Sequence, residues 1–379
     1  MPQANRKTSE VSIGKKPRLP ETPVLEEELE RLDSFRDVRD RHLVINGLRI
    51  AWRPKADLDA LGLDAEGLRR LYVFMALGRT FEERIAELYR QGLVPGSAFF
   101  GRGNEGLSVG AASALDAEDT MVPMHRNLPA HLVRGQDLKE LMAHYLGRVD
   151  GVNRGRDLHY GNRKHNIIQL ISHIGTMIPI ACGAAWTAKY RDDGSAALVV
   201  CGDGATSTGD FHQGLNLAAV HRLPLVVIIE NNLWAYKTPT RMQYACKTLA
   251  LRAIGYGIPG YLIDGTDVAA CYEVCREALG RARAGEGPIL IESMNVRIGG
   301  HSIYDAYTDY LTEAEIAGWE SGDPIPLFEQ RLRAAGHGDD SFFQETEARN
   351  LELIEEAVNY AKDSPFPEGH EASGGVFAP

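Results

Sequence analysis

Asp203 and Asn232 are the residues whose types and spacing best fit catalytic chemistry. Asp203 lies in a Gly-Asp-Gly turn after one apolar, β-branched run, and Asn232 follows a second such run. One carboxylate and one amide oxygen suit Mg²⁺, which takes few protein oxygens and fills its octahedron with water and phosphate. Gly202 and Gly204 would let the backbone approach phosphate groups. The pattern predicts a site for a metal-bound diphosphate, although a Gly-Asp-Gly turn alone is also an ordinary connection from strand to helix.

The elements around these two residues predict how they meet. Leu198 to Cys201 and Leu225 to Glu230 are short apolar runs typical of strands, and Phe211 to Val220 repeats its apolar residues at helical spacing. A β-α-β unit has parallel strands that are buried on both faces, and ligands bind beyond their carboxyl ends. We therefore expect the side chains of Asp203 and Asn232 to converge.

Strands and helices alternate along the middle of the chain. Further strands are predicted at Gly260 to Asp264 and Ile289 to Met294, with a helix over Asp267 to Ala284 between them. A strand-like segment, Leu43 to Trp52, and a helical run, Glu66 to Gln91, come earlier. This order predicts an α/β fold with a doubly wound, mostly parallel sheet flanked by helices.

We divide the chain into four segments. They are a flexible N-terminal arm over 1–24, an N-terminal packing or interface segment over 25–95, an α/β domain over 96–311 and a C-terminal helical segment with its tail over 312–379. The sheet itself is expected to run from about Gly96 to Arg297.

Composition narrows the class of protein without specifying a function. The 379 residues are 44% hydrophobic and 25% charged, which is enough to bury a large core. The net charge of −11 argues against a general nucleic-acid surface, and no apolar run has membrane-spanning length. Met1 to Pro23 mixes basic and acidic residues and has no apolar core of a secretory signal, so we expect a cytoplasmic protein. The five cysteines form no CxxC pair, and reduced thiols are expected.

Several ordered motifs now point to a known family. The Gly-Asp-Gly turn followed by Asn231-Asn232 resembles the thiamine-diphosphate signature, and the wider chain resembles the alpha subunit of the decarboxylating component of 2-oxoacid dehydrogenase complexes, of the branched-chain and pyruvate type. The matching pieces are GNEGLSVGAASAL (Gly103 to Leu115), HR (His125, Arg126), GRDLHYG (Gly155 to Gly161), SHIGTMIPIACGAA (Ser172 to Ala185) and RIGGHSIYD (Arg297 to Asp305).

The resemblance implies a thiamine-diphosphate-binding fold, with helical extensions at both ends, and the residues that hold the cofactor. Asp203, Asn232 and the main-chain carbonyl of Trp234 match magnesium ligands. Arg126 matches the arginine that holds phosphate, a task that suits the fixed fork of a guanidinium. The backbone around the diphosphate would come from Gly202, Gly204 and Ala205.

Other matched residues would contact the reacting end of the cofactor. Ser172 and Ile174 match positions whose backbone meets the aminopyrimidine ring, with Ile174 the bulky residue that imposes the bent cofactor shape; the apolar pattern alone would place Ile174 in the core. His125 replaces a tyrosine that is frequent in the family before Arg126. It could still donate a hydrogen bond.

His301 matches the histidine that hydrogen-bonds near the reacting centre, where an imidazole can exchange a proton near neutral pH. The loop that follows departs from the family, because the usual tyrosine-arginine pair is Tyr310-Leu311 here. The resemblance therefore leaves the closure of this loop and the docking of a lipoyl group open. Ser302 stands where animal relatives are phosphorylated.

The resemblance also implies a reaction and partners. The chain would decarboxylate a small 2-oxoacid with thiamine diphosphate and Mg²⁺, and transfer the acyl group to the lipoyl group of a partner acyltransferase. A beta subunit would complete the cofactor site in a heterotetramer. No nucleic-acid or membrane partner is expected.

Substrate identity stays open at the level of sequence. GRDLHYG, the segment from Tyr256 to Gly260 and RIGGHS favour a branched-chain 2-oxoacid slightly, whereas Glu230-Asn231-Asn232 and His125-Arg126 are more typical of pyruvate or acetoin relatives. Phe99, Phe100 and Tyr236 are candidates for pocket walls or for packing. A non-catalytic cofactor-binding paralogue and a transketolase-like enzyme without lipoate are the alternatives.

Overall fold

The computed structural model describes residues 42–45, 48–169 and 171–374 of the chain. All of them belong to one unit, Val38–Pro379. The predicted flexible arm over 1–24 lies outside the described residues.

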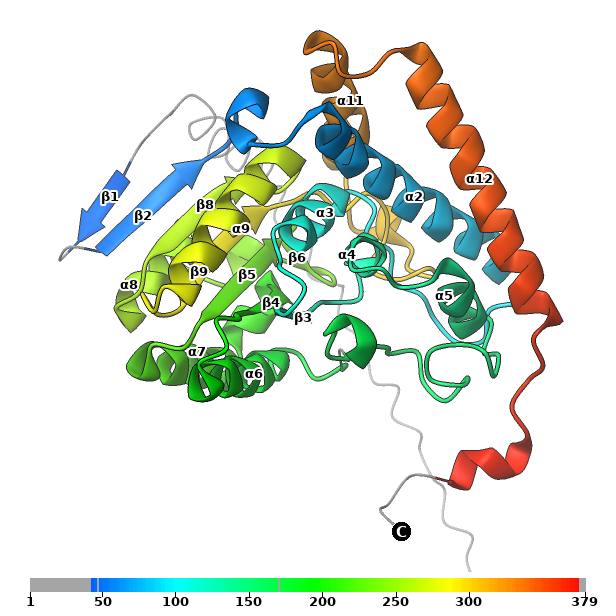
Figure 1. The fold of residues 1–379 in the computed structure, drawn as a ribbon, viewed down its shortest axis with the longest axis horizontal. Helices are drawn as coiled ribbons and strands as arrows, with labels where there is room; N and C mark the ends of the chain where they lie inside the picture. Colours follow the sequence, from blue (N-terminus) through cyan, green and yellow to red (C-terminus); the bar gives the residue numbers. More distant parts are fainter. Residues whose placement is uncertain (1–41, 46–47, 170, 375–379) are drawn as a thin grey trace, which may run out of the picture. The chain divides into compact units, whose positions relative to one another are not determined.

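A seven-stranded sheet forms the centre of the described residues (Figure 1). Its order is β1-β2-β8-β9-β5-β4-β3, and β1 is antiparallel to β2 whereas all other neighbours are parallel. This confirms the predicted mostly parallel α/β fold. The strands are β1 (His42–Ile45), β2 (Leu48–Arg53), β3 (Thr120–Val122), β4 (Ala197–Gly202), β5 (Leu225–Asn231), β8 (Gly260–Asp264) and β9 (Ile289–Met294), and a separate ladder joins β6 (Trp234–Ala235) to β7 (Thr238–Pro239).

The sheet extends further than the sequence predicted. The single strand expected over Leu43 to Trp52 is two strands, and β2 pairs with β8, with Ile50 opposite Gly260. The sheet therefore begins before Gly96 and includes part of the segment that we had set outside it. Strand β3 was not predicted, because its three residues are too few to show a period.

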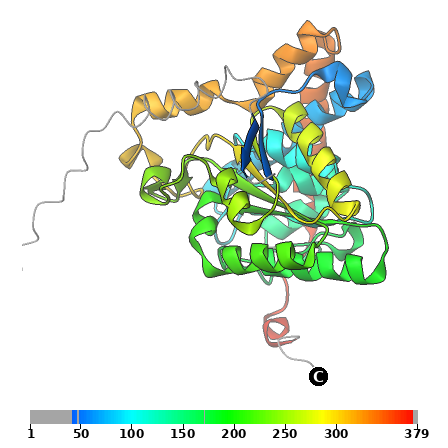
Figure 2. The ribbon, with the colours of Figure 1, turned by 90° about the vertical axis from the view of Figure 1, so that its left-hand side faces the viewer.

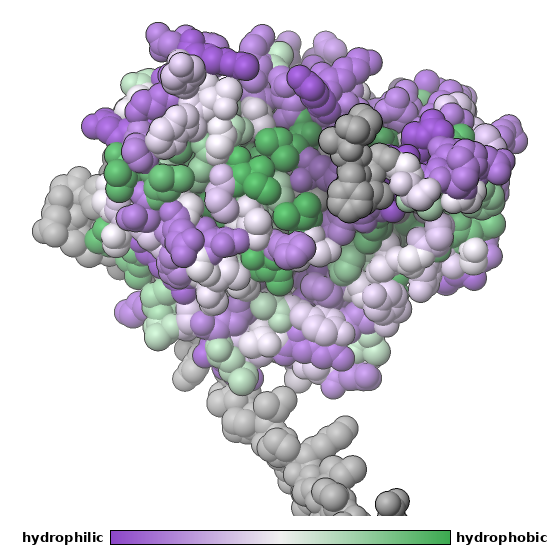
Figure 3. Space-filling model, turned by 90° about the horizontal axis from the view of Figure 1, so that it is seen from below, coloured by the Kyte–Doolittle hydropathy of each residue, from purple (hydrophilic) through white to green (hydrophobic). Residues whose placement is uncertain are grey.

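Helices cover both faces of the sheet (Figures 1 and 2). Helices α6 (Met177–Arg191) and α7 (Gly209–His221) lie on one face, and α9 (Val268–Arg283) packs on the other with α3 (Glu105–Ser113) against it. Figure 3, which views the molecule from the side of α6 and α7, shows apolar residues interspersed among polar ones.

Helix α2 (Ala65–Arg90) confirms the helical run predicted from Glu66 to Gln91, and α4 (Leu128–Val133), α11 (Pro324–Ala334) and α12 (Asp340–Asp363) pack against it. The remaining helices are α5 (Leu138–Tyr145), α8 (Arg252–Tyr256) and α10 (Glu313–Ser321). Short 3-10 helices occur at η1 (Leu58–Leu61), η2 (Arg163–His165), η3 (Asp203–Ser207), η4 (Thr240–Met242), η5 (Leu249–Leu251), η6 (Tyr307–Asp309) and η7 (Gly369–Ser373).

Burial explains why the central strands are nearly continuous apolar runs. Every residue of β5 is buried, as expected for a parallel strand that has helices on both faces. Capping aspartates then start the flanking helices: the Asp64 carboxylate accepts the Gly67 N–H at 2.7 Å before α2, and the Asp267 carboxylate accepts the Ala269 N–H at 3.0 Å before α9.

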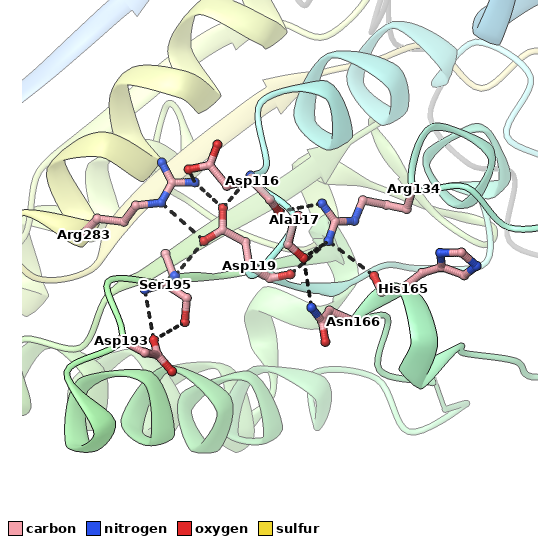
Figure 4. A network of polar contacts seen from close by, with 10 residues as sticks. Asp116, Ala117, Asp119, Arg134, His165, Asn166, Asp193, Ser195 and Arg283 are labelled. Carbon is pink, nitrogen blue, oxygen red and sulfur yellow. Dashed lines mark hydrogen bonds and ion pairs between the residues drawn. The ribbon is translucent and has the colours of Figure 1, made fainter.

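A polar network fixes the edge of the sheet at β3 (Figure 4). The carboxylate of Asp119 is fully buried, accepts the N–H of Ala196 at 2.8 Å and forms an ion pair with Arg283 of α9. Arg283 also lies 2.9 Å from the exposed carboxylate of Asp116. Arg134 donates to the main-chain carbonyls of the same turn, including that of Asp116 at 2.7 Å. The network ties the turn before β3 to β4 and α9.

The cysteines are free thiols in the structure, and Cys271 and Cys275 are buried in α9. Across the part of the chain that the structure describes, no group of three His, Cys, Asp or Glu side chains forms a metal cluster. Within the same residues, none of the helices combines the length and the apolar character needed to cross a bilayer.

Candidate active site

The strand ends bring Asp203 and Asn232 to the same edge of the sheet. Strands β4 and β5 are parallel neighbours, with Gly202 opposite Glu230, and Asp203 and Asn232 lie just beyond their carboxyl ends. Both side chains are buried, at 2% and 5% exposure. The predicted convergence therefore follows from the register of the sheet.

The environment of Asp203 suits a cation. Burial raises the pKa of Asp203 to about 6, against the opposing effects of a hydrogen bond from Gln243 and of the charge of Arg297. The Gln243 amide donates to Asp203 Oδ2 at 2.7 Å, while its own oxygen is buried without a hydrogen-bond partner. A bound cation would replace the solvation that the carboxylate has lost and would offer a partner to this amide oxygen.

The loop after β5 has an unusual backbone. Leu233 and Tyr236 have φ values of 70° and 54°, which non-glycine residues rarely adopt and which recur at ligand sites. The Asn231 side chain stabilises the turn by accepting the N–H of Leu233 at 3.1 Å. The Trp234 carbonyl, a predicted metal ligand, accepts a long contact of 3.4 Å from Arg297.

The small residues of the turn, Gly202, Gly204 and Ala205, have different surroundings. A Cβ on Gly204 would lie 2.8 Å from the Cβ of Ala235, so glycine is needed there for packing between η3 and β6. At Gly202 the nearest atom to an added Cβ would be Met124 Cε, at an ordinary contact distance of 3.8 Å, so a small side chain would fit beside the strand end. Ala205 is 3% exposed. Gly202 thus has no packing contact that requires glycine, whereas Gly204 serves a contact that the sequence did not reveal.

Arg126 lies beside His301 although 175 residues separate them. Its guanidinium donates to the carbonyl of Phe100 at 2.6 Å and to that of His301 at 2.9 Å, and one nitrogen lies 3.4 Å from His301 Nδ1. Burial lowers the pKa of Arg126, and the carboxylates of Glu230 and Glu82 act in the opposite direction. Two of its five N–H groups hold carbonyls, and the others can hold phosphate.

Two predicted histidines form one wall of the site. The rings of His125 and His301 lie 4.8 Å and 5.4 Å from the ring of Phe99, and His301 also lies 4.6 Å from the ring of Tyr236. Burial lowers the pKa of each imidazole to about 4, and the charge of Arg126 contributes. Near neutral pH both rings are therefore uncharged and can either donate or accept through each nitrogen.

The loop after His301 is held by hydrogen bonds among Asp305, Tyr310 and Arg297. Asp305 Oδ2 accepts the His301 N–H at 2.8 Å and the Tyr310 hydroxyl at 2.6 Å. Arg297 donates to the Tyr310 oxygen at 3.0 Å, and Leu311 is buried. Arg297, just beyond the carboxyl end of β9, thus contacts this loop, in which Leu311 stands where the family usually has an arginine.

Ser172 and Ile174 lie in the turn that precedes α6. The side chain of Ile174 is 65% exposed and is not the core residue that its apolar character alone predicted. Ser172 is exposed too, and its hydroxyl lies 2.8 Å from Nε2 of His159. Ser302, in contrast, is 8% exposed.

Two buried carboxylates near the site, Glu82 and Glu230, were missed by the sequence reasoning. The Glu82 carboxylate accepts the Gly101 N–H at 2.8 and 3.0 Å, and Glu230 accepts the Asn127 amide at 2.9 Å. Burial raises the pKa of Glu82 to about 8 and that of Glu230 to about 7. A signal for Glu82 was present, because it occupies the helical spacing of Ile85 and other apolar positions of α2.

Comparisons with known proteins agree with this geometry. The family model described as dehydrogenase E1 component matches residues 72–370. The chain is 35% identical to the alpha subunit of acetoin:2,6-dichlorophenolindophenol oxidoreductase of Bacillus subtilis over 84% of this chain and 96% of that one. It is 35% identical to the 2-oxoisovalerate dehydrogenase subunit alpha of the same organism over 84% and 98%, and 34% identical to the chloroplastic pyruvate dehydrogenase E1 component subunit alpha-3 of Arabidopsis thaliana over 83% and 74%. These matches confirm the resemblance inferred from the motifs. The chain belongs to the dehydrogenase E1 component family.

Proposed function

We propose that this chain is the alpha subunit of an enzyme that oxidatively decarboxylates a 2-oxoacid with thiamine diphosphate and Mg²⁺ and passes the acyl group to the lipoyl group of a partner acyltransferase. The observation that carries the proposal is the meeting of the buried Asp203 and Asn232 with the Arg126–His301 pair from distant segments. Family membership supports the cofactor, and the names of the relatives support the reaction class.

The residues present fit the cofactor and its metal. Asp203 and Asn232 with the Trp234 carbonyl would bind Mg²⁺, and the free N–H groups of Arg126 would bind a phosphate. Thiamine diphosphate would supply the carbanion chemistry and store the electrons of the broken carbon–carbon bond. Gly202, which has no side chain, would let a diphosphate oxygen approach the backbone at the strand end.

His301 is the residue that we assign to proton transfer near the reacting centre. Its pKa of about 4 keeps the ring neutral at pH 7, so that one nitrogen can accept a proton and the other can donate one. The hydrogen bond from its backbone to Asp305 and the carbonyl contact with Arg126 fix the position of the loop. His125 shares this wall, where we propose that it orients substrate.

The proposed enzyme also needs a second subunit of the beta type. Ile174, a candidate contact of the cofactor ring, is 65% exposed, and Tyr236 is 49% exposed. The names of the relatives, which are alpha subunits, support a partner chain, and these exposed side chains would be available to it. We propose a heterotetramer with the cofactor at the interface between alpha and beta subunits.

The substrate is proposed to be a branched-chain 2-oxoacid, with a slight preference over pyruvate. The 2-oxoisovalerate and acetoin relatives are equally similar to this chain, at 35% identity. Acetoin is therefore a second candidate substrate.

The test is a co-purified complex of this chain with its beta-type partner. The decarboxylation of 3-methyl-2-oxobutanoate, the decarboxylation of pyruvate and the cleavage of acetoin would each be measured. Each assay would be run with and without thiamine diphosphate and Mg²⁺. We expect activity on one of them that requires both additions and is lost in Asp203→Ala. A complex that binds the cofactor and turns over none of these compounds would contradict the proposal and favour a non-catalytic paralogue.

A further inference from the structure

Glu292 is a buried carboxylate of the central sheet that the proposed reaction does not use. It lies on β9, the strand beside β5, and is 1% exposed. One of its oxygens accepts the side-chain amide of Asn231 at 2.8 Å, and the other accepts the N–H of Ala250, in η5, at 2.8 Å. The carboxylate therefore joins the carboxyl end of β5 to η5.

Asn231, the partner of Glu292, uses both ends of its side-chain amide. Its N–H groups donate to Glu292 and to the hydroxyl of Tyr244, at 2.8 and 2.9 Å, and its oxygen accepts the N–H of Leu233 at 3.1 Å. The N–H of Leu233 can only donate, so the Asn231 oxygen faces it and the NH2 group faces Glu292. The orientation of the Asn231 side chain is thus fixed from both sides.

The turn that Asn231 holds carries two of the proposed magnesium ligands. Leu233, which separates Asn232 from Trp234, has a φ of 70°. This left-handed conformation costs free energy that surrounding contacts must offset. The Asn231 oxygen supplies one such contact, and the N–H of Thr240, which donates to the Leu233 carbonyl at 3.0 Å, supplies another. The direction of both ligands therefore depends on Asn231.

We propose that Glu292 is a positioning residue, which orients Asn231 and through it the turn that presents the proposed magnesium ligands. Glu292 acts through Asn231, since its two oxygens point to N–H groups of Asn231 and Ala250. The proposal rests on the proposed function in taking Mg²⁺ as the ligand of this turn.

Reversing one hydrogen bond tests this chain of contacts. In Glu292→Gln an NH2 group replaces one acceptor and faces either the Ala250 N–H or the Asn231 amide. If the Asn231 amide flips to meet it, the Asn231 NH2 group faces the N–H of Leu233, and the turn loses its acceptor. Adding Asn231→Asp supplies oxygens toward both neighbours. The double variant therefore restores the hydrogen bonds, with one of them in the reverse direction.

The test uses the complex of this chain with its beta-type partner, as wild type, Glu292→Gln, Asn231→Asp and the double variant. The control is Asp119→Asn, which alters a buried carboxylate that also accepts a main-chain N–H but lies before β3, at the opposite ends of the strands. Titration calorimetry gives the Kd of Mg²⁺ at saturating thiamine diphosphate, and scanning calorimetry gives the unfolding temperature. Hydrogen exchange without either ligand reports on the amides of residues 232–240. None of these measurements requires turnover.

We expect Glu292→Gln to raise the Kd of Mg²⁺ about tenfold, as the loss of one hydrogen bond predicts, and to speed amide exchange in the loop after β5. Asn231→Asp places two buried carboxylates against each other and should raise the Kd at least as much. The double variant should return to within about threefold of wild type. Asp119→Asn should lower the unfolding temperature without changing the Kd of Mg²⁺.

The proposal is overturned if Glu292→Gln binds Mg²⁺ as tightly as wild type, or if the double variant binds it no better than Glu292→Gln. It is also overturned if Asp119→Asn, at a similar loss of unfolding temperature, weakens Mg²⁺ binding equally, because Glu292 would then serve only the fold. If Glu292→Gln yields no folded complex, Tyr244→Phe, which removes only the second acceptor of the Asn231 amide, must raise the Kd of Mg²⁺, and an unchanged Kd overturns the proposal.

The proposed reaction fails in a different way. A wild-type complex that binds Mg²⁺ and thiamine diphosphate but turns over no 2-oxoacid refutes that reaction and leaves the test of Glu292 unchanged. A wild-type complex that binds no Mg²⁺ overturns both.

Discussion

At the scale of single residues, the site concentrates charged groups in a buried environment. Arg126 is the clearest case, because its side chain both fixes two carbonyls and has N–H groups left for a ligand. In Arg126→Lys a single ammonium replaces the planar fork, so we expect the Kd of thiamine diphosphate to rise roughly 10- to 100-fold in the complex. Calorimetry measures this, with the exposed Arg102→Lys as the control; equal affinities would show that Arg126 does not bind the phosphate.

Glu82 gives a prediction for stability against pH. Its folded pKa of about 8 lies above the unfolded value near 4.5, so the folded chain holds a proton that the unfolded chain releases. The free energy of unfolding therefore falls as the pH rises from about 4.5 to about 8, and above pH 8 it no longer changes through Glu82. Glu82→Gln removes this dependence, and we expect it to gain about 2 kcal/mol relative to wild type between pH 6 and pH 9 in urea unfolding. Parallel pH curves for the two proteins would refute the prediction.

Sequence reasoning found the residues that the sheet itself positions. Asp203 and Asn232 were predictable because parallel neighbouring strands end at one edge. The partners Gln243 and His159 were not, because each makes its contact through a loop that no local pattern encodes. Their positions depend on tertiary packing.

At the scale of elements, the Asp119 network should contribute measurably to stability. Asp119→Ala leaves Arg283 partly buried without its closest carboxylate and leaves the Ala196 N–H without an acceptor. We expect a loss of about 3 kcal/mol in the free energy of unfolding. Asp116→Ala is the matched control, because Asp116 also pairs with Arg283 but its side chain is 66% exposed, and its expected cost is below about 1 kcal/mol. Similar losses for the two variants would contradict this ranking.

The loop that supports Arg126 gives a second prediction at this scale. A Cβ on Gly101 would lie 2.0 Å from the carbonyl oxygen of Arg126, so Gly101→Ala must displace that backbone. We expect a destabilisation of about 2 kcal/mol together with weaker cofactor binding. Gly280→Ala in α9 has no atom within 4 Å and should be neutral or stabilising by up to about 1 kcal/mol. Thermal unfolding and calorimetry separate the two variants, and an unchanged Gly101→Ala protein would show that the loop can relax.

Long apolar runs made most elements predictable. The strands Gly260–Asp264 and Ile289–Met294 match the predicted bounds, because each is a short, mostly apolar run beside turn residues, Gly265 after the first and Pro288 before the second. The hairpin of β1 and β2 was predicted as one strand because both halves are apolar. Its pairing with β8 brings together residues about 200 positions apart in the chain, and such pairing leaves no local signal.

At the scale of the whole molecule, the chain presents a site that is open on one side. Ile174 and Tyr236, both candidates for contact with the proposed ligands, are exposed, whereas Asp203 and Asn232 are buried. A ligand that reaches from the buried pair to Ile174 would remain partly in water. This arrangement predicts that the chain alone binds the cofactor weakly.

We therefore expect the purified single chain to show no decarboxylation and little affinity for thiamine diphosphate. Addition of the beta-type partner should produce decarboxylation activity and tight cofactor binding. Light scattering should then show two copies of each chain, and calorimetry should show the gain in affinity. Ile174→Ala should weaken cofactor binding in the complex yet leave the unfolding temperature of the isolated chain unchanged, because the side chain is 65% exposed. Robust turnover by the chain alone would refute the shared site, and a lower unfolding temperature in Ile174→Ala would show that this residue serves the fold rather than the interface.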